Sequence, residues 1–547
     1  MQKQVAVADA ASEPDAESRV DLDRQSKGPA GPIIFVLVLL GGLAFVVWSI
    51  VKDIDASGTS TLAIIPFALL LLALLIALGF EFVNGFHDTA NAVATVIYTN
   101  SLPAHFAVVW SGLWNFLGVL ASSGAVAFGI ISLLPVELIL NVGSSAGMAM
   151  VFALLIAAII WNLGTWYLGL PASSSHTLIG SIIGVGLANQ LLHGFSGTSG
   201  VDWSQATKIG YSLLFSPVIG FIAAGLLLVA LKVLVKNPDL YREPKKKKAP
   251  PWWIRSILVL TCTGVSFAHG SNDGQKGMGL IMLILIGIVP TTYALNKAVS
   301  PADMAQFRAL AQVTATSLTE VSGTGDGGAA LAPGEDPRAT LTAYVRDRTL
   351  APDTVPALAA ITRQLARDVA GAPTLADVPA SAVSNVRNDM YLTSETIRVM
   401  LKTGEPAFDT ETRQNLLAFE RSLDEATKFI PLWVKIAVAI ALGLGTMVGW
   451  KRIVVTVGEK IGKTHLTYAQ GGAAEVVAMG TILAADGFGL PVSTTQVLSS
   501  GVAGTMAANG SGLQMSTVRN LALAWVLTLP AAITLSGGIY LLLLQIF

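Results

Sequence analysis

The sequence has little cysteine and little charge. Cys262 is the single cysteine among 547 residues, which excludes an intramolecular disulfide and a cluster of thiolate metal ligands. Charged residues make up 13% of the chain, whereas soluble globular proteins carry roughly 25%. The formal net charge of -1 gives no signal for nucleic-acid binding. With 53% hydrophobic residues and a mean hydropathy of +0.63, the composition predicts an integral membrane protein.

Long apolar runs fill most of the chain. About 20 helical residues, rising 1.5 Å each, cross a hydrocarbon core of ~30 Å. A polar tail predicted to be disordered, residues 1–31, precedes the first run. Residues 32–56 are therefore predicted to be an additional transmembrane anchor rather than a cleaved signal peptide. The predicted spans are Pro32–Val51, Leu62–Val83, Ala104–Leu134, Gly147–Leu170, Ile209–Val235, Ile254–Ala268, Gly277–Leu295, Leu432–Trp450 and Leu521–Phe547, with shorter apolar pieces at Pro171–Asn189 and Pro491–Asn509.

A polar motif interrupts the apolar sequence twice. Residues 85–92 read GFHDTANA and residues 270–277 read GSNDGQKG, so that Gly85 superposes on Gly270 and Asp88 on Asp273. A carboxylate at bilayer depth is costly unless it is paired or lines a wet cavity, which makes it a functional-site hypothesis. A buried helix cap is the alternative for one such Asp, but the repetition favours substrate or ion ligation.

A second motif is repeated as well. GLPASSSHTLIGSIIGVGLAN (residues 169–189) superposes on GLPVSTTQVLSSGVAGTMAAN (residues 489–509). The two Asp motifs lie 185 residues apart and these motifs lie 320 apart. The difference between these two offsets matches the length of a polar segment that only the second half of the chain contains. The chain is therefore predicted to be two copies of one unit, with a small soluble helical insertion in the second.

Basic loops predict the orientation. An excess of Lys and Arg marks cytoplasmic loops, and the strongest excess lies between the two copies. Each copy then crosses an odd number of times, which predicts inverted-topology repeats with discontinuous helices and re-entrant hairpins, one break falling at GSNDGQKG. The predicted all-α organisation is a tail at 1–31, an anchor at 32–56, repeat 1 at 57–235, a basic cytoplasmic linker at 236–253, repeat 2 in two parts at 254–296 and 431–547, and a periplasmic helical insertion at 297–430.

Hydroxyl clusters begin the two shorter apolar pieces. Ser173–Ser175 and Ser493–Thr495 each follow a proline, which is typical of a helix start. A helix N-terminus offers free N–H groups and partial positive charge, so it binds oxyanions. N-capping and small-residue packing are the alternatives, but two copies in the same frame favour an anion site.

The predicted site also contains carboxylates. Asn91 and Lys276 each follow an Asp by three residues, so each shares that residue's helix face. An ionised Asp repels an anion unless the anion carries a proton or a cation lies between them. Phosphate near pH 7 keeps P–OH groups that donate to Asp, whereas sulfate has none, so these residues favour phosphate. They also offer hard oxygen ligands for a cation, or a site for a co-transported proton.

The histidines are weaker signals. His87 and His269 border the Asp motifs in different frames, and His176 has Gln496 as its counterpart. For each histidine, a polar contact inside the bundle is as well supported as proton handling.

Three further acids adjoin apolar runs, namely Glu81, Glu475 and Asp486. The last two are expected only to line an entrance.

A membrane-embedded metalloenzyme is a different class of function. It would use His87, Asp88, His176 and His269, but the sequence shows neither paired His at i, i+4 nor a nucleophile beside a base.

The motifs closely resemble the inorganic phosphate transporter (PiT) family, in its bacterial low-affinity phosphate permease branch. Besides the paired Asp and GLP motifs, WNLGTWY (161–167), TYAQG (467–471) and GWKRIVVTVGEKIGK (449–463) carry the likeness. It covers both copies but neither the tail nor the insertion.

The resemblance implies a multi-pass symporter of the inner (plasma) membrane that imports inorganic phosphate by alternating access. The coupling ion would be a proton, with phosphate moving in some cases as a divalent-metal complex, or sodium. No enzyme activity, cofactor or dedicated metal site is implied, the partners are phosphate and the lipid bilayer, and a homo-oligomer stays open. A sulfate or other oxyanion permease on the same scaffold is the alternative.

The resemblance also implies a set of site residues. Lys276 stands where many members have Asn, which puts a sodium site there in question, since an ammonium can take a cation's place. Gln496 replaces a His that is usual in the bacterial branch. The implied phosphate-binding residues are Asp88, Asn91, Ser173, Ser174, Ser175, Asp273, Lys276, Ser493, Thr494 and Thr495, and the coupling-ion or proton candidates are His87, Asp88, Asn272, Asp273 and His176.

Overall fold

The protein is helical throughout the part of the chain that the structure describes. Within it, the one β feature is an isolated bridge between Gly462 and Leu513. This computed structural model describes residue 22 and residues 30–57, 63–88, 90–194, 200–244, 248–322 and 335–547, without the side chains of Ala30, Asp88, Ala90 and Asn91.

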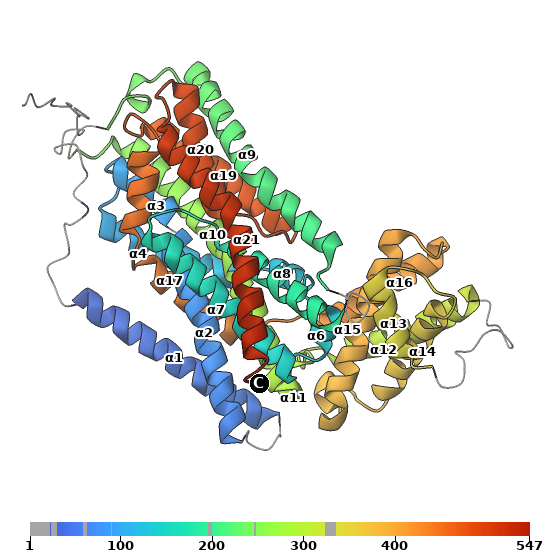
Figure 1. Cartoon of the computed structure of the whole chain (residues 1–547). Helices are drawn as coiled ribbons and strands as arrows, with labels where there is room; N and C mark the ends of the chain where they lie inside the picture. The colour runs from blue at the N-terminus through green and yellow to red at the C-terminus, as the bar shows by residue number, and fades with distance from the viewer. Residues whose placement is uncertain are drawn as a thin grey trace, which may run out of the picture.

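Figure 1 shows how the helices follow one another. Short 3-10 segments lie at Pro238–Leu240 and Leu375–Asp377, and a π-helical turn lies at Thr456–Lys460. The α-helices are α1 (Ala30–Ala56), α2 (Ile64–Asp88), α3 (Ala90–Tyr98), α4 (Ala104–Ala121), α5 (Ala125–Ile131), α6 (Val136–Leu140), α7 (Ser145–Tyr167), α8 (Ser174–His193), α9 (Trp203–Leu234), α10 (Trp252–Ile288), α11 (Pro290–Tyr293), α12 (Pro301–Val321), α13 (Pro337–Asp347), α14 (Thr354–Asp368), α15 (Ala380–Thr403), α16 (Thr410–Thr427), α17 (Leu432–Thr446), α18 (Lys451–Val455), α19 (Tyr468–Gly487), α20 (Thr494–Asn509) and α21 (Met515–Leu543).

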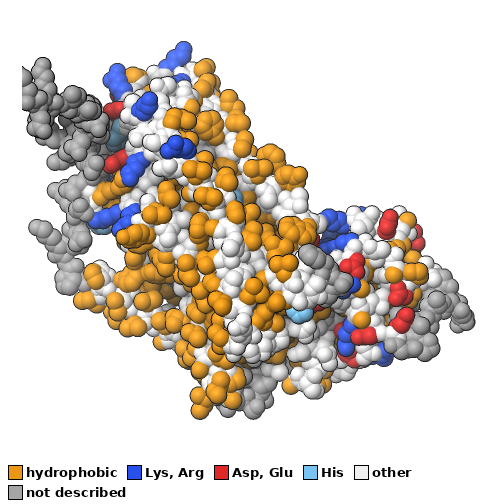
Figure 2. Space-filling view, viewed as in Figure 1, with side chains coloured by type: hydrophobic (Ala, Val, Ile, Leu, Met, Phe, Trp, Pro, Cys, Tyr) orange, Lys and Arg blue, Asp and Glu red, His pale blue; other side chains and the backbone are white. Residues whose placement is uncertain are grey.

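The molecule has two parts. Long helices form one body, and α12–α16 form a bundle beside it (Figure 1). Apolar side chains cover the flank of the body, whereas acidic side chains gather on the bundle (Figure 2). Six spans in the described residues are long and apolar enough to cross a membrane: α1, α2 together with α3, α4, α7, α9 and α21. The predicted all-α membrane fold is confirmed.

The helix α10 corrects one prediction. A break was expected at GSNDGQKG, but α10 runs unbroken for 37 residues, about 55 Å at 1.5 Å per residue. Its polar segment is fully enclosed by other helices. Side chains in this segment bond to neighbouring elements, so the helix accommodates them without opening its own backbone. The predicted span Ile254–Ala268 and the first part of the predicted span Gly277–Leu295 are therefore parts of one helix, which ends at Ile288.

One other prediction about the helices was wrong. The run Ala104–Leu134 is not one span, because α4 ends at Ala121 and Gly124 turns the chain with φ +90° before α5. The helix α19 was not predicted as a span, and it is not among the six spans. Its Gly- and Ala-rich sequence is less apolar than the other runs, yet tertiary packing buries one of its faces.

The two copies make matching contacts. In the first, α2 packs against α17 and α8 against α21; in the second, α10 packs against α4 and α20 against α9. The superposed glycines lie at these crossings. A Cβ on Gly85 would come within 2.3 Å of the Leu442 carbonyl oxygen of α17, and one on Gly270 within 2.1 Å of the Asn115 carbonyl oxygen of α4. The repeated glycine therefore lets the Asp-bearing helix touch its neighbour's backbone.

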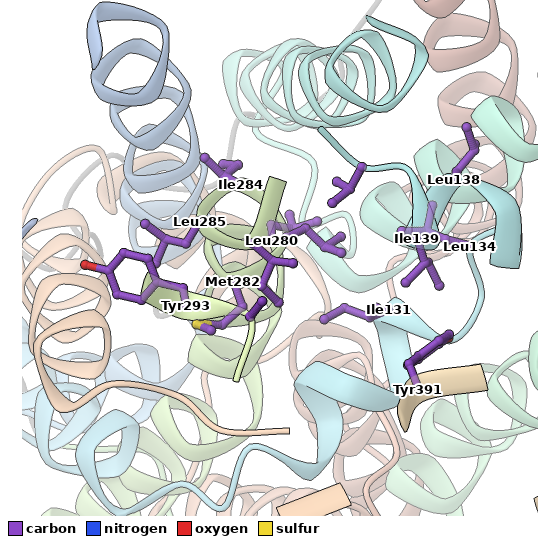
Figure 3. Close-up of a cluster of buried hydrophobic side chains, with 14 of the residues drawn as sticks. Ile131, Leu134, Leu138, Ile139, Leu280, Met282, Ile284, Leu285, Tyr293 and Tyr391 are labelled. Carbon is purple, nitrogen blue, oxygen red and sulfur yellow. The ribbon is translucent and has the colours of Figure 1, made fainter. Parts of the chain in front are cut away.

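The α12–α16 bundle leaves the second copy and docks on the first. Arg387 and Asn388 of α15 donate to the carbonyl oxygens of Ile139 and Leu140, at 3.2 and 3.1 Å. Figure 3 shows the apolar junction, where Tyr391 of α15 lies near Leu134, which follows α5. Since α11 follows α10 directly, the bundle is attached at the C-terminal end of that helix.

Candidate functional site

One face of α10 carries a buried charged pair. Lys276 Nζ lies 2.8 Å from Asp273 Oδ2, and both side chains are 0% exposed. His269 Nε2 lies 3.4 Å from the same oxygen, and His269 Nδ1 is 2.9 Å from Asn115 Oδ1 of α4. Spacings of three and four residues align these side chains on the helix. Lys276 and Asp273 are close enough for an ion pair, but their atoms are not aligned for a hydrogen bond. Both Asp273 carboxylate oxygens can therefore still accept hydrogen bonds from a ligand.

The opposite face of the same segment of α10 is hydrogen-bonded to the second GLP motif and to the end of α19, which precedes it. Asn272 donates to the Leu490 carbonyl at 3.1 Å and accepts from the Val492 amide at 3.4 Å. Ser271 and Gln275 donate to the Asp486 carboxylate at 2.7 and 2.6 Å. The non-acidic polar residues of GSNDGQKG therefore attach α10 to the chain that leads into α20.

The two hydroxyl motifs form matching helix starts. Ser173 caps α8, its Oγ accepting from the His176 amide at 3.2 Å, and Ser493 caps α20, its Oγ accepting from the Gln496 amide at 3.2 Å. Such a cap satisfies one of the free N–H groups of a helix N-terminus. Both caps are buried, so two helix N-termini with their partial positive charge lie inside the protein.

Val492 joins three of the four motifs. Its carbonyl accepts from Ser175 Oγ at 2.6 Å, which connects the first hydroxyl motif to the second. Its amide donates to Asn272, the neighbour of Asp273. The helix α8 packs laterally against α7 and α21, whereas α20 packs against α19 and α9. The two helices therefore meet near their N-termini and diverge from there.

Several polar atoms at this meeting point are buried without a hydrogen-bond partner among the described residues. They are Thr494 Oγ1 of α20, Gln496 Nε2 of α20 and His176 Nδ1 of α8. The Lys276 ammonium also lies within electrostatic range of the His176 ring. An unpaired buried polar group costs about 1–3 kcal/mol, so a ligand that pairs with these atoms recovers that free energy.

The first Asp motif is described in part. His87 Nε2 lies 3.1 Å from Thr165 Oγ1 of α7, which ties the end of α2 to the helix before the first hydroxyl motif. The side chains of Asp88 and Asn91 lie outside the described residues. Ser174 and Thr495, the remaining predicted phosphate ligands, are buried within the first turns of α8 and α20.

Two further carboxyl groups are buried in the membrane-spanning body, and the first of them reaches the segment of α10 that bears Asp273 and Lys276. Glu81 of α2 is 0% exposed and accepts from the Gly277 amide of α10 at 2.6 Å. Glu475 was expected to line an entrance, but it is also 0% exposed and bonds to Thr261 of α10. A carboxyl group within an apolar helix is the sequence signal that identifies both. Among the described residues, no three His, Cys, Asp or Glu side chains are placed to hold a metal ion.

Comparison with known proteins agrees with these motifs. The model of the phosphate transporter family matches residues 84–536. The low-affinity inorganic phosphate transporter PitA of Escherichia coli strain K12 is 44% identical over 494 residues, which cover 87% of this chain and 97% of that protein. A probable low-affinity inorganic phosphate transporter of Bacillus subtilis is 27% identical over 483 residues, 88% of this chain and 99% of that protein.

A solved structure described as the sodium-dependent phosphate transporter aligns over 88% of this chain and 100% of its own, with a TM-score of 0.48 and 19% identity. The family match spans both Asp motifs and both hydroxyl motifs. The chain therefore belongs to the phosphate transporter family.

Proposed function

We propose that this protein imports inorganic phosphate across the inner membrane as a secondary active symporter. The contact that carries the proposal is the one at Val492, where Ser175 and Asn272 meet the second hydroxyl motif. Segments that lie far apart in the sequence thereby converge within the membrane-spanning body. Its relatives in Escherichia coli and Bacillus subtilis are described as phosphate transporters.

The hydroxyl motifs supply donors for an oxyanion. The N-termini of α8 and α20 offer partial positive charge, and the Thr494 hydroxyl and the Gln496 amide are buried without partners among the described residues. Binding a phosphate there would pair these two donors, which carry no charge of their own. The same groups would serve sulfate, so they select an oxyanion rather than phosphate.

The Asp273–Lys276 pair on α10 would let the site distinguish phosphate from sulfate. Lys276 attracts an anion, whereas Asp273 repels one unless the anion donates a hydrogen bond. Phosphate near pH 7 carries P–OH groups that can donate to the Asp273 carboxylate, and sulfate carries none. An acceptor that sulfate cannot satisfy would remain buried and unpaired, which disfavours sulfate.

Alternating access would follow from two copies inserted in opposite directions. The divergence of α8 and α20 from a shared meeting point supports this arrangement, with the substrate held near the midplane. The loop between α9 and α10 contains Lys236, Arg242 and Lys248 and leads into the start of α10, whereas the α12–α16 bundle follows the other end of that helix. Positive loops favour the cytoplasm, so the bundle would be periplasmic.

Protons are the coupling ion that we favour. Lys276 holds the place beside Asp273 where a metal cation would otherwise balance the carboxylate. Asn272, a candidate ligand for a coupling ion, has its amide engaged with Leu490 and Val492. Phosphate moving as a neutral metal complex would be compatible with a site whose own cation is a single ammonium.

Transport assays on the purified full-length protein in proteoliposomes test the proposal. Labelled phosphate should enter under an imposed inward proton gradient, and a sodium gradient alone should not replace it. Asp88→Asn and Asp273→Asn should each abolish uptake while the protein stays in the membrane. Near-normal transport by both variants would remove the site assignment. Inhibition by sulfate at equal concentration would identify a general oxyanion permease instead.

A further inference from the structure

Glu81 is a carboxylate in the first copy that reaches the charged pair of the second. Its Oε1 accepts from the Gly277 amide of α10 at 2.6 Å, and Gly277 follows Lys276 directly. A Cβ on Gly277 would lie only 2.3 Å from Glu81 Cγ, so the glycine makes room for this approach. Glu81 therefore lies against the segment of α10 that bears Asp273 and Lys276.

The cations around Glu81 are few. Lys276 is the ammonium that acts on it, and the same ammonium is held 2.8 Å from Asp273. One ammonium balances one carboxylate, and a second ionised carboxylate in this interior would be left uncompensated at a cost of several kcal/mol. For this interior to be neutral, either Glu81 or a neighbouring group must therefore bind a proton.

The elements packed around α2 offer few other titratable groups. The helices α3 and α7 carry no charged residue, and Lys435 of α17 donates to the Ser122 carbonyl at 2.7 Å. His269 contacts Asp273 from α10, His176 of α8 is within electrostatic range of Lys276, and α2 itself ends with His87. Asp88 follows on the same helix, its side chain outside the described residues.

Asn84 can serve both protonation states of Glu81. Its Nδ2 donates to Glu81 Oε2 at 3.4 Å, while its Oδ1 is buried without a hydrogen-bond partner among the described residues. An ionised carboxylate accepts from the amide nitrogen. After a half-turn of the side-chain amide, a protonated carboxyl donates to the amide oxygen instead. Neither state of Glu81 then loses a partner.

The second copy has no equivalent group. Ser266 occupies the position of Glu81, 185 residues on, and its Oγ lies 2.7 Å from Ser111 Oγ. The described residues therefore place this carboxyl on one side of the pseudo-symmetric site only.

We propose that Glu81 carries the proton that is co-transported with phosphate, taking it up with substrate on the periplasmic side and releasing it to the cytoplasm. This assignment rests on the proposed function. It makes Glu81 a coupling residue that acts beside the Asp273–Lys276 pair rather than a phosphate ligand.

Glu81→Gln in the full-length protein, reconstituted in proteoliposomes, tests the assignment in two transport modes. Exchange of labelled for unlabelled phosphate at equal pH needs binding and alternating access but no net proton movement, and it should be retained. Stimulation of net uptake by an inward proton gradient should be lost. Unchanged stimulation, or loss of both modes together, would overturn the assignment.

Two further variants sharpen the result. Glu475→Gln removes another fully buried carboxyl, which is bonded to Thr261. This variant should keep the stimulation of net uptake by the proton gradient. If Glu475→Gln lost the stimulation as well, the effect would not be specific to Glu81. Glu81→Asp keeps an ionisable group on a shorter side chain, so stimulation should persist with a displaced pH profile. An unchanged profile would contradict the proposal even if Glu81→Gln did not fold.

The same assays separate a failure of the proposed function from a failure of the role proposed for Glu81. Wild-type protein without phosphate exchange would refute phosphate transport itself. Exchange without any proton stimulation in the wild type would refute proton coupling, and with it the role of Glu81.

Discussion

The ring of Phe86 packs edge-on against that of Trp166, with 5.2 Å between the ring centroids. The positions that superpose on these two in the second copy are Ser271 and Asp486, joined by a hydrogen bond of 2.7 Å. Each pair connects an Asp-bearing helix to the end of the helix before a hydroxyl motif. A contact between aromatic rings therefore closes one side of the candidate site, and a hydrogen bond closes the other.

The two contacts face different ends of the molecule. Trp166 Nε1 donates to the Gly449 carbonyl at 2.8 Å, and the Arg452 guanidinium lies 5.2 Å from its ring, at the basic end. Gln275, which also bonds Asp486, accepts from the Val126 amide of α5, on the side of the α12–α16 bundle.

Breaking the contact between Ser271 and Asp486 should expose the candidate site on the side of the α12–α16 bundle. Asp486→Leu removes the acceptor for Ser271 and Gln275, because leucine offers no side-chain oxygen. We expect a cysteine placed at Leu490, in a Cys262→Ala background, to react several-fold faster with a membrane-impermeant maleimide. Trp166→Leu is the matched control for the other contact and should leave that rate unchanged. Equal rates with and without the Asp486→Leu change would show that this contact does not hold the site closed.

Removing Lys276 should destabilise the protein more than removing the whole pair. Lys276→Met leaves Asp273 buried without its cation, which costs about 3–5 kcal/mol for a broken buried ion pair. The double variant Lys276→Met with Asp273→Asn leaves no uncompensated charge and should recover most of that stability, without recovering uptake. Thermal unfolding in detergent measures the first effect and phosphate uptake the second. A double variant no more stable than Lys276→Met would contradict the charge argument.

The glycines at helix crossings should not tolerate alanine. A Cβ on Gly270 would lie 2.1 Å from the Asn115 carbonyl oxygen, so α10 and α4 must separate, at a cost of roughly 1–3 kcal/mol. A Cβ on Gly79 of α2 would have no atom within 4 Å, and the change to alanine there should stabilise the helix by up to ~1 kcal/mol. Melting temperatures of Gly270→Ala and Gly79→Ala should therefore move in opposite directions, and a shared direction would refute the packing argument.

The Thr494 hydroxyl should matter to phosphate and not to folding. Its Oγ1 is buried without a partner among the described residues, so Thr494→Val removes an unpaired polar atom and should leave the melting temperature equal or higher. The KM for phosphate should rise about tenfold, the equivalent of ~1.4 kcal/mol of lost binding. Thr177 bonds the Ser173 carbonyl at 2.9 Å, and Thr177→Val should instead lower stability with little change in KM. An unchanged KM for Thr494→Val would remove this hydroxyl from the site.

The α12–α16 bundle should lose part of its stability in acid. The backbone N–H of Thr412 donates to the Asp409 carboxylate at 2.7 Å and lowers its pKa below the ordinary value. A depressed pKa contributes stability that is present above the unfolded pKa, about 3.9, and is lost as pH falls through the folded value. Hydrogen exchange at the start of α16, corrected for intrinsic rates, should be slower in the wild type than in Asp409→Asn at pH 6. That difference should shrink towards pH 3; a constant difference would argue against the shift.

The sequence by itself determined the class of protein and the residue types of its candidate site. Apolar run lengths identified the membrane helices, because crossing the hydrocarbon imposes a length and composition on each span. The repeated Asp and GLP motifs identified the residue types of the candidate site, because costly polar groups in the membrane recur only where something holds them.

Only the tertiary structure decided how these residues are partnered. Whether GSNDGQKG breaks a helix depends on what satisfies its side chains, and here Asp486 and Val492, more than two hundred residues away, do so within an unbroken α10. Glu81 likewise meets Gly277 across 196 residues. Local sequence patterns report which face of a helix is buried, but not which helix covers it, and that long-range choice sets the charge balance around Asp273 and Lys276.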